Sequence, residues 1–333
     1  MPEKEKVIVP PDVARISEGL RDTGYEFNTA VADVIDNSIA AGASQVDVRI
    51  IADYDGNIIL SVGDNGCGMD RDGLINAMKY GSRKRDDPSS LGKFGLGLKT
   101  ASTAFCRRLT VVSRSAAQAN VLRAVWDLDV MGDTNSWELE LAPAVPHERQ
   151  LLEESAKGSA GTVVIWEKVD RLLSDTRKPD SKAFKNAMGR LEVQLADHIA
   201  TVYQRFLDES DSRCRNITIL LNGKRVLAWD PFCLSETKKA EAEAVVPVEL
   251  YDGRKAEFSI KAFILPRKEE INSDANRQKA RISNELQGVY VYRENRLIHG
   301  PIGWECIKRS HISLCFASSY PSIIDLTMHF RLI

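Results

Sequence analysis

The sequence lacks the marks of membrane, secreted and metal-cluster proteins. Among its 333 residues, no apolar run reaches the length of a membrane-spanning helix. Residues 1–15 are polar and contain prolines, a composition that is not that of a signal peptide. The six cysteines show no metal-ligand spacing, and their scatter is typical of reduced thiols. We therefore expect a cytoplasmic protein that makes no membrane contact.

A strong charge imbalance is also missing. The 45 Lys and Arg residues nearly balance the 47 Asp and Glu residues, which gives a formal net charge of −2. Such a chain has no bulk attraction to nucleic acid, so any DNA contact requires a local basic patch. The compact basic cluster in the first half is Lys79, Arg83, Lys84 and Arg85. The length is sufficient for two domains that each bury a core.

The first of three chemically informative motifs is VADVIDNSIAAGA at residues 31–43. Its apolar residues fall at helical spacing, and Gly42 marks the helix end. Asp33 and Asn37 are four residues apart, so both leave the same face of this helix. The motif therefore places an acid and an amide side by side.

The second motif is DNGCGM, from Asp64 to Met69, which follows an apolar strand at residues 58–62. Gly66 and Gly68 allow the backbone to approach a flat ligand closely. Asp64 offers a buried carboxylate to a ring amine. This arrangement suits a heterocyclic base.

The third motif, LGKFGLGLKTAS at residues 91–102, is a glycine-rich turn that leads into a helix over residues 99–104. Free N–H groups at a helix start, with a lysine beside them, form a phosphate site. These glycines do not precede a GK[ST] sequence and no strand leads directly into them, which excludes a P-loop and a Rossmann motif. The three motifs together indicate one nucleotide pocket.

The order and spacing of these motifs resemble the GHKL ATPase superfamily of gyrase, heat-shock chaperones, histidine kinases and MutL. The resemblance implies an α+β Bergerat-type domain, with a mostly antiparallel sheet covered by helices on one face, that binds ATP and Mg²⁺. Asn37 would coordinate Mg²⁺ and Asp64 would accept a hydrogen bond from the adenine amine. The residues nominated for ATP contact are Asn37, Asp64, Gly66, Gly68, Met69, Gly92, Lys93, Gly95, Gly97, Lys99, Thr100 and Thr162.

Asp33 departs from the pattern of the superfamily. The acid that activates water there is usually a glutamate four residues before the Mg²⁺ asparagine, and this chain has Asp33 in that place. Aspartate is one methylene shorter, so it reaches the water only if the helix lies closer or a second water relays the proton. We predict that Asp33 is the general base and that turnover is slow.

The expected elements of the first half follow the same periodicities. Tyr25 and Phe27, between the first two helices, are interpreted as core residues. The polar segment between Tyr80 and Leu91 is interpreted as a mobile lid. The predicted helices cover residues 13–20, 28–41 and 73–78, and the predicted strands cover 45–52, 58–62, 109–113, 120–127, 137–141 and 161–166.

We predict four segments along the chain. Residues 1–12 form a flexible arm, with an exchanged dimer strap as the alternative, and 13–172 form the ATP-binding domain. Residues 173–300 form an α+β transducer-like domain, and 301–333 a divergent or truncated tail. The alternative for the tail is packing against the transducer or a partner.

The second half is predicted to contain a long helix over 181–209, a hairpin over 216–229 with an Asn-Gly corner, and strands at 257–265 and 288–292. LNGKRVLAWDPF (221–232) and QGVYVYRENRLIHG (287–300) look like the transducer of MORC-type ATPases and their prokaryotic relatives. Lys279 is the candidate for a lysine that reaches the γ-phosphate.

These observations favour an ATP-gated dimeric clamp, with DNA or a protein client as an additional partner by analogy. A nucleotide-sensing module that binds ATP without turnover is the first alternative, and a heat-shock-type chaperone is the second. A histidine kinase is disfavoured because no phospho-acceptor helices are apparent. The biological pathway does not follow from the sequence.

Overall fold

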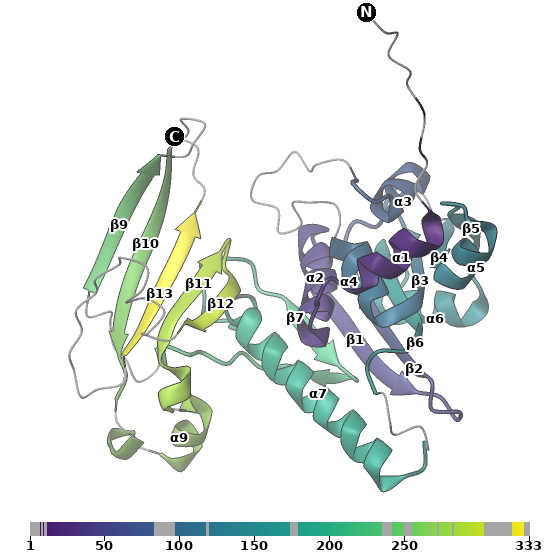
Figure 1. Cartoon of the computed structure of the whole chain (residues 1–333). Coiled ribbons are helices and arrows are strands. Elements are labelled where there is room, and N and C mark those ends of the chain that lie inside the picture. The colour runs from purple at the N-terminus through teal and green to yellow at the C-terminus, as the bar shows by residue number, and fades with distance from the viewer. Residues whose placement is uncertain are drawn as a thin grey trace, which may run out of the picture. The chain divides into compact units, whose positions relative to one another are not determined.

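The structure of the protein is a computed structural model that describes residues 7, 9, 12–82, 97–117, 120–173, 179–234, 242–249, 255–266, 268–271, 273–281, 283–302 and 322–329. The chain forms two compact units (Figure 1). The first contains the described residues up to Glu192 together with Ile219–Lys224. The second contains Val193–Thr218 and the described residues from Arg225 onward.

An eight-stranded sheet forms the framework of the first unit. The pairings from β5 through to β1 are all antiparallel. Because side chains alternate between the two faces of a strand, the inner strands each serve two layers of core. In spatial order the strands are β5 (Glu140–Pro143), β4 (Val121–Asp127), β3 (Cys106–Arg114), β6 (Gly161–Val169), β2 (Ile58–Asp64), β1 (Gln45–Ala52), β7 (Thr218–Leu221) and β8 (Lys224–Arg225).

Helices cover both faces of this sheet. On one face Phe27 and Phe105 pack against Trp166, with the Phe105 and Trp166 rings stacked at 6.2 Å between centroids. On the other face Ile165, the neighbour of Trp166, packs in one cluster with Leu152. The helices of this unit are α1 (Val13–Arg21), α2 (Phe27–Ala40), α3 (Arg71–Met78), α4 (Gly97–Phe105), α5 (Leu128–Thr134) and α6 (Pro146–Ala156).

Two of these helices, α5 and α6, were absent from the sequence prediction. The expectation of helices on one face is corrected by α6, which carries Leu152 to the opposite face of the sheet. Its sequence is mostly polar, with a single strip of buried residues, so the apolar period is weak. The predicted strand at 137–141 begins later, at Glu140, because Trp137 belongs instead to an aromatic cluster with Tyr80 and Trp126.

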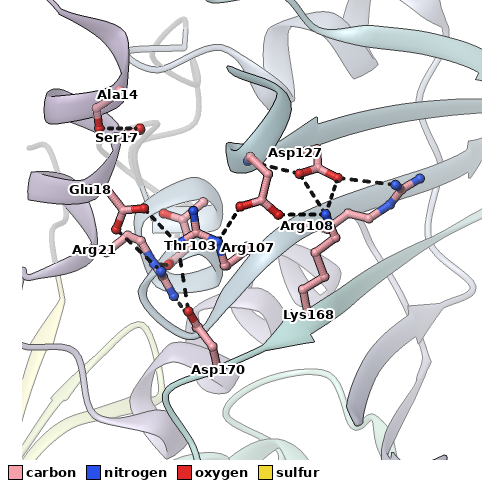
Figure 2. Close-up of polar contacts among 11 residues, drawn as sticks. Ala14, Ser17, Glu18, Arg21, Thr103, Arg107, Arg108, Asp127, Lys168 and Asp170 are labelled. Carbon is pink, nitrogen blue, oxygen red and sulfur yellow. Dashed lines mark hydrogen bonds and ion pairs between the residues drawn. The ribbon is translucent and has the colours of Figure 1, made fainter. Parts of the chain in front are cut away.

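Charged side chains fix α1 to the sheet (Figure 2). The Nε of the buried Arg21 donates to the Thr103 carbonyl at 2.8 Å, and the same guanidinium pairs with Asp170 after β6. Arg107 joins Glu18 of α1 at 2.8 Å and Asp129 of α5 at 2.6 Å. This network holds the helix that precedes α2 in place.

The second unit is built on a mixed five-stranded sheet in the order β12, β11, β13, β10, β9. Only the β11–β13 pairing is parallel among these described strands. Phe232, Phe263 and Tyr290 lie in its core. Its elements are α8 (Gln204–Leu207), β9 (Ala242–Glu249), β10 (Lys255–Ile264), two 3-10 turns (Lys268–Glu270 and Asn284–Leu286), α9 (Asp274–Ala280), β11 (Gly288–Arg293), β12 (Arg296–Ile302) and β13 (Ser322–His329).

The predicted helix over 181–209 is two helices. α7 spans Lys182–Val202, the backbone leaves helical geometry at Tyr203, and α8 follows. Residues 202–207 are buried without interruption, which the two-sided pattern of one straight amphipathic helix does not allow. The boundary between the two units falls within α7, after Glu192. None of the helices that the structure describes has the length and apolar composition to cross a bilayer.

Two further elements differ from the prediction. The hairpin expected in the second domain is an edge of the first sheet, where the Asn222 N–H donates to Val48 O at 2.9 Å and its Oδ1 accepts from Ile50 N at 3.0 Å. In the segment predicted as a divergent tail, β13 is the centre strand of the second sheet, paired with β10 and β11. Strand order depends on these long-range partners, which periodicity does not specify.

Candidate nucleotide-binding site

The end of β2 carries the most constrained acid of the three motifs. Asp64 is 4% exposed, and both of its carboxylate oxygens are hydrogen-bonded. Ser38 Oγ donates to Oδ2 at 2.8 Å, and the Gly66 N–H donates to Oδ1 at 2.8 Å. Burial raises the pKa of the carboxyl above its ordinary value, and the bonds from Gly66, Ser38 and the Thr162 backbone oppose that rise. Asp64 is therefore an oriented acceptor in a low-dielectric position.

Thr162 lies directly across the β2–β6 ladder from Asp64. Its hydroxyl is 2.8 Å from Ser113 Oγ, which also accepts from the Met69 N–H at 2.8 Å. Ser113 thus joins the loop after β2 to the start of β6. The structure brings Asp64, Met69 and Thr162 into one corner, as the sequence nominated them.

The two glycines of the second motif are required by contacts within the protein. A Cβ atom on Gly66 would lie 2.8 Å from Ala41 O, and one on Gly68 would lie 1.9 Å from Arg114 O. Gly68 also has φ +64°, in the region that favours glycine. The sequence predicts that these glycines let the backbone approach a ligand closely. In the structure they let the loop after β2 approach the backbone of Ala41 and Arg114, and these contacts fix the course of the loop.

Asp33 and Asn37 lie on α2, as the helical spacing predicts. The Asn37 Nδ2 donates to the Asp33 carbonyl at 2.9 Å, which orients the carboxamide along the helix. The Asp33 Oδ2 accepts from the Tyr25 hydroxyl at 3.0 Å. A methyl group built on Gly97 would lie 3.6 Å from the same oxygen, so the start of α4 adjoins this carboxylate.

The helix α2 therefore joins all three motifs. Ser38, beside Asn37, reaches Asp64 of the second motif, and Asp33 lies against Gly97 of the third. Sequence reasoning missed Ser38 and Ser113 and assigned Tyr25 to the core. Their contacts depend on how α2, α4 and the sheet meet, and serine is too common for its presence to be a signal.

Lys99, which is nominated for phosphate contact, bonds to the end of α3. It is 2% exposed, and its Nζ donates to Ala77 O at 2.9 Å, in the last turn of α3. A cation at that helix end is favourable because the carbonyl groups there carry partial negative charge. Burial lowers the pKa of the Lys99 ammonium to about 8. Its predicted phosphate contact stays a prediction.

Several nominated residues lie outside the described part of the chain. Gly92, Lys93 and Gly95 belong to residues 83–96, as does most of the predicted lid and of its basic cluster. Besides Lys99, the described residues of the third motif that are nominated for ATP contact are Gly97 and Thr100, in the first turn of α4. Lys279 lies on α9 of the second unit.

The metal prediction rests on Asn37 alone. In the ranges that the structure describes, no group of three or more His, Cys, Asp or Glu side chains could hold a metal. Mg²⁺ takes few protein ligands and completes its shell with water and substrate phosphates. The Asn37 side chain supplies the hard oxygen that such an ion prefers, on the same helix as Asp33.

Part of the chain is similar to known proteins. Residues 25–162 match the family of histidine kinase-, DNA gyrase B-, and HSP90-like ATPases. The DNA mismatch repair protein MutL of Shewanella baltica is 32% identical over 123 residues, which are 35% of this chain and 19% of MutL. The ATPase MORC2B of Mus musculus is 36% identical over 77 residues, 22% of this chain and 8% of that protein. The chain thus matches a fifth or less of the length of these relatives.

A solved structure is also similar. The ATPase and transducer domains of DNA topoisomerase II from Balamuthia mandrillaris align with a TM-score of 0.46 and 13% identity, covering 91% of this chain and 72% of that one. The family match includes Asp33, Asn37, Asp64 and Thr162. Over residues 25–162 the chain is therefore similar to the GHKL ATPases.

Proposed function

We propose that the chain binds ATP with Mg²⁺ and hydrolyses it slowly. The observation that carries this proposal is Asp64, a buried carboxylate whose two oxygens are fixed by Ser38 and Gly66. A preformed acceptor of this kind suits an amine on a flat heterocycle, and it costs no reorganisation when the ligand arrives. In this proposal Gly66, Gly68, Met69 and Thr162 form the adenine corner around it.

The other end of the nucleotide lies towards α4. Here Gly92, Lys93, Gly95, Gly97, Lys99 and Thr100 contact the phosphates through backbone N–H groups and the lysine charges. Asn37 holds Mg²⁺, which supplies charge neutralisation for the phosphate oxygens when it is bound. Asp33 acts as general base towards the attacking water.

Calorimetry with a non-hydrolysable ATP analogue, in the presence and absence of Mg²⁺, tests the binding step. We expect saturable binding in the wild type and much weaker binding in Asp64→Asn. The Asp55→Asn variant is the matched control, since Asp55 lies in the exposed β1–β2 turn. Equal affinities for the wild type and Asp64→Asn would contradict the adenine assignment.

We further propose that ATP draws two copies of the chain together and that the second unit transmits this closure as a transducer. The relatives that support it are MutL and MORC2B, to which part of the chain is similar. Closure follows only if ATP binds the closed state more tightly than the open one. The mass in solution should double on addition of the analogue with Mg²⁺, and a constant monomer mass would exclude the clamp.

A DNA partner is proposed because the similar MutL is a DNA mismatch repair protein. The near-neutral charge balance requires this contact to be local. Binding to duplex DNA should weaken steeply with salt and should depend on ATP. Binding that is absent at about 50 mM salt, with and without ATP, would leave a protein client as the partner.

One observation favours a second function. Asp33 stands where the superfamily usually has glutamate, so the chain would also suit a module that senses ATP without turnover. Phosphate release at saturating ATP separates the two proposals, since the sensor binds the analogue but releases no phosphate. We place either form of the protein in the cytoplasm, in line with the four described cysteines, all of which are free thiols.

A further inference from the structure

Tyr25 is joined to the proposed general base by a hydrogen bond. It lies in the short loop between α1 and α2, eight residues before Asp33, and its hydroxyl donates to Asp33 Oδ2 at 3.0 Å. The side chain is half-buried, so this bond is shielded from bulk water. A hydrogen bond to a charged group in such a place is stronger than one between neutral groups.

The same hydroxyl also hydrogen-bonds the Thr100 side chain in the first turn of α4. Burial, and then the neighbouring Asp33 charge, raise the pKa of the Tyr25 phenol. The phenol therefore stays protonated at neutral pH and donates to Asp33, while the Thr100 hydroxyl donates to it. This chain of hydroxyl groups joins the helix after the glycine-rich turn to the carboxylate on α2.

We infer that Tyr25 is a positioning residue, which fixes the Asp33 carboxylate and ties its orientation to the start of α4. An aspartate is one methylene too short for the place of a glutamate, so its direction matters more. With Oδ2 held by Tyr25 and Gly97 adjoining that oxygen, the carboxylate has a set direction relative to the turn where the phosphates are proposed to bind. This inference rests on the proposed hydrolysis of ATP.

Tyr25→Phe tests it, because this change removes one hydroxyl and keeps the ring. We expect kcat to fall about tenfold or more, the effect of losing a hydrogen bond to a charged group. KM and the affinity for the non-hydrolysable analogue should stay within about twofold, since Tyr25 acts on the base and not on ATP. The control is Tyr54→Phe, at a tyrosine that is fully exposed in the β1–β2 turn, and it should leave kcat unchanged.

The outcomes separate this inference from the proposed function. If Asp33→Asn stops hydrolysis and Tyr25→Phe leaves kcat unchanged, the positioning role is wrong and the base assignment stands. If Tyr25→Phe weakens ATP binding by the same factor by which it lowers kcat, and also lowers the melting temperature, Tyr25 has only a structural role. If Asp33→Asn hydrolyses ATP at the wild-type rate, or the wild type does not hydrolyse it, the base assignment fails and the role of Tyr25 fails with it.

Discussion

The two ends of the proposed nucleotide site are built differently. At the adenine end, Asp64, Ser113 and Thr162 lie on strands of one sheet and are buried, and their polar groups bond to one another, to backbone or to Ser38. At the phosphate end, Asp33 and Asn37 lie on a helix and are half-buried. The adenine end is held mainly by the pairing of strands in the sheet, whereas the phosphate end depends on how α2 and α4 pack. Binding and turnover should therefore respond to different substitutions.

The largest expected effect lies at the phosphate end. Asp33→Asn should lower kcat by about 100-fold or more, because a general base contributes roughly 10²- to 10⁴-fold. The affinity for ATP should change little, since the amide keeps the size of the side chain. Single-turnover phosphate release with matched calorimetry checks both. A parallel loss of affinity would show that the two ends are not separable.

At the adenine end, Asp64→Asn should weaken ATP binding by about 100-fold, because a charged acceptor is replaced by an amide whose N–H₂ faces other donors. Any residual hydrolysis should reach a kcat close to the wild-type value at saturating ATP. Titration calorimetry and a saturation curve measure the two quantities. A reduced kcat at full saturation would place Asp64 in turnover as well.

Gly68→Ala probes the rigidity of the corner directly. The added methyl would lie 1.9 Å from Arg114 O, at φ +64°. We expect a loss of more than about 3 kcal/mol in the free energy of unfolding, from the strained backbone and the overlap together. Gly158→Ala is the matched control, since Gly158 has φ +82° and an added Cβ there would meet no atom within 4 Å. It should cost only about 1–2 kcal/mol. Equal losses in urea unfolding would refute the packing role.

The last prediction concerns the pH dependence of stability at Lys99. Its folded pKa, about 8, lies below the ordinary 10.5, so the unfolded chain binds more protons between these values. The free energy of unfolding of the wild type, relative to that of Lys99→Met, should therefore rise between about pH 8 and pH 10.5, by up to about 1 kcal/mol per pH unit. Below about pH 8 the difference should be constant. Urea unfolding at about pH 7, 8, 9 and 10 measures it, and a flat difference would mean that the ammonium is well solvated.

The sequence was most informative where chemistry and local period coincide. β1 was predicted at its observed bounds, and α2 and β2 were predicted within two residues, because strong apolar periods end at turn residues. Asp33 and Asn37 were placed on the right helix for the same reason, whereas Asp64 was placed just after the strand of which it is the last residue. Thr162 was nominated from the family resemblance. Its position opposite Asp64 is set by the register of the β2–β6 pairing.

The parts that escaped prediction are set by long-range contacts. Ser38 and Tyr25 acquire their roles from the packing of α2 against β2 and α4. Ser113 acquires its role from the β3–β6 pairing and from the loop after β2, and no local pattern specifies any of these contacts. β13 lies between β10 and β11 although its segment shows little period of its own. The β7–β8 hairpin was recognised by its Asn-Gly corner, but its partner, β1, was not.

The β7–β8 hairpin determines when the first sheet can be completed during synthesis. The first unit includes residues 219–224, so its sheet lacks an edge until the ribosome has added the whole of α7 and the loop after it. At about 5–20 residues per second, the exposed edge of β1 waits for seconds after its own synthesis. An expression fragment cut at residue 172 or 192 would keep that edge open, and an open β-edge invites pairing with other chains. Fragments for study should therefore continue past Lys224.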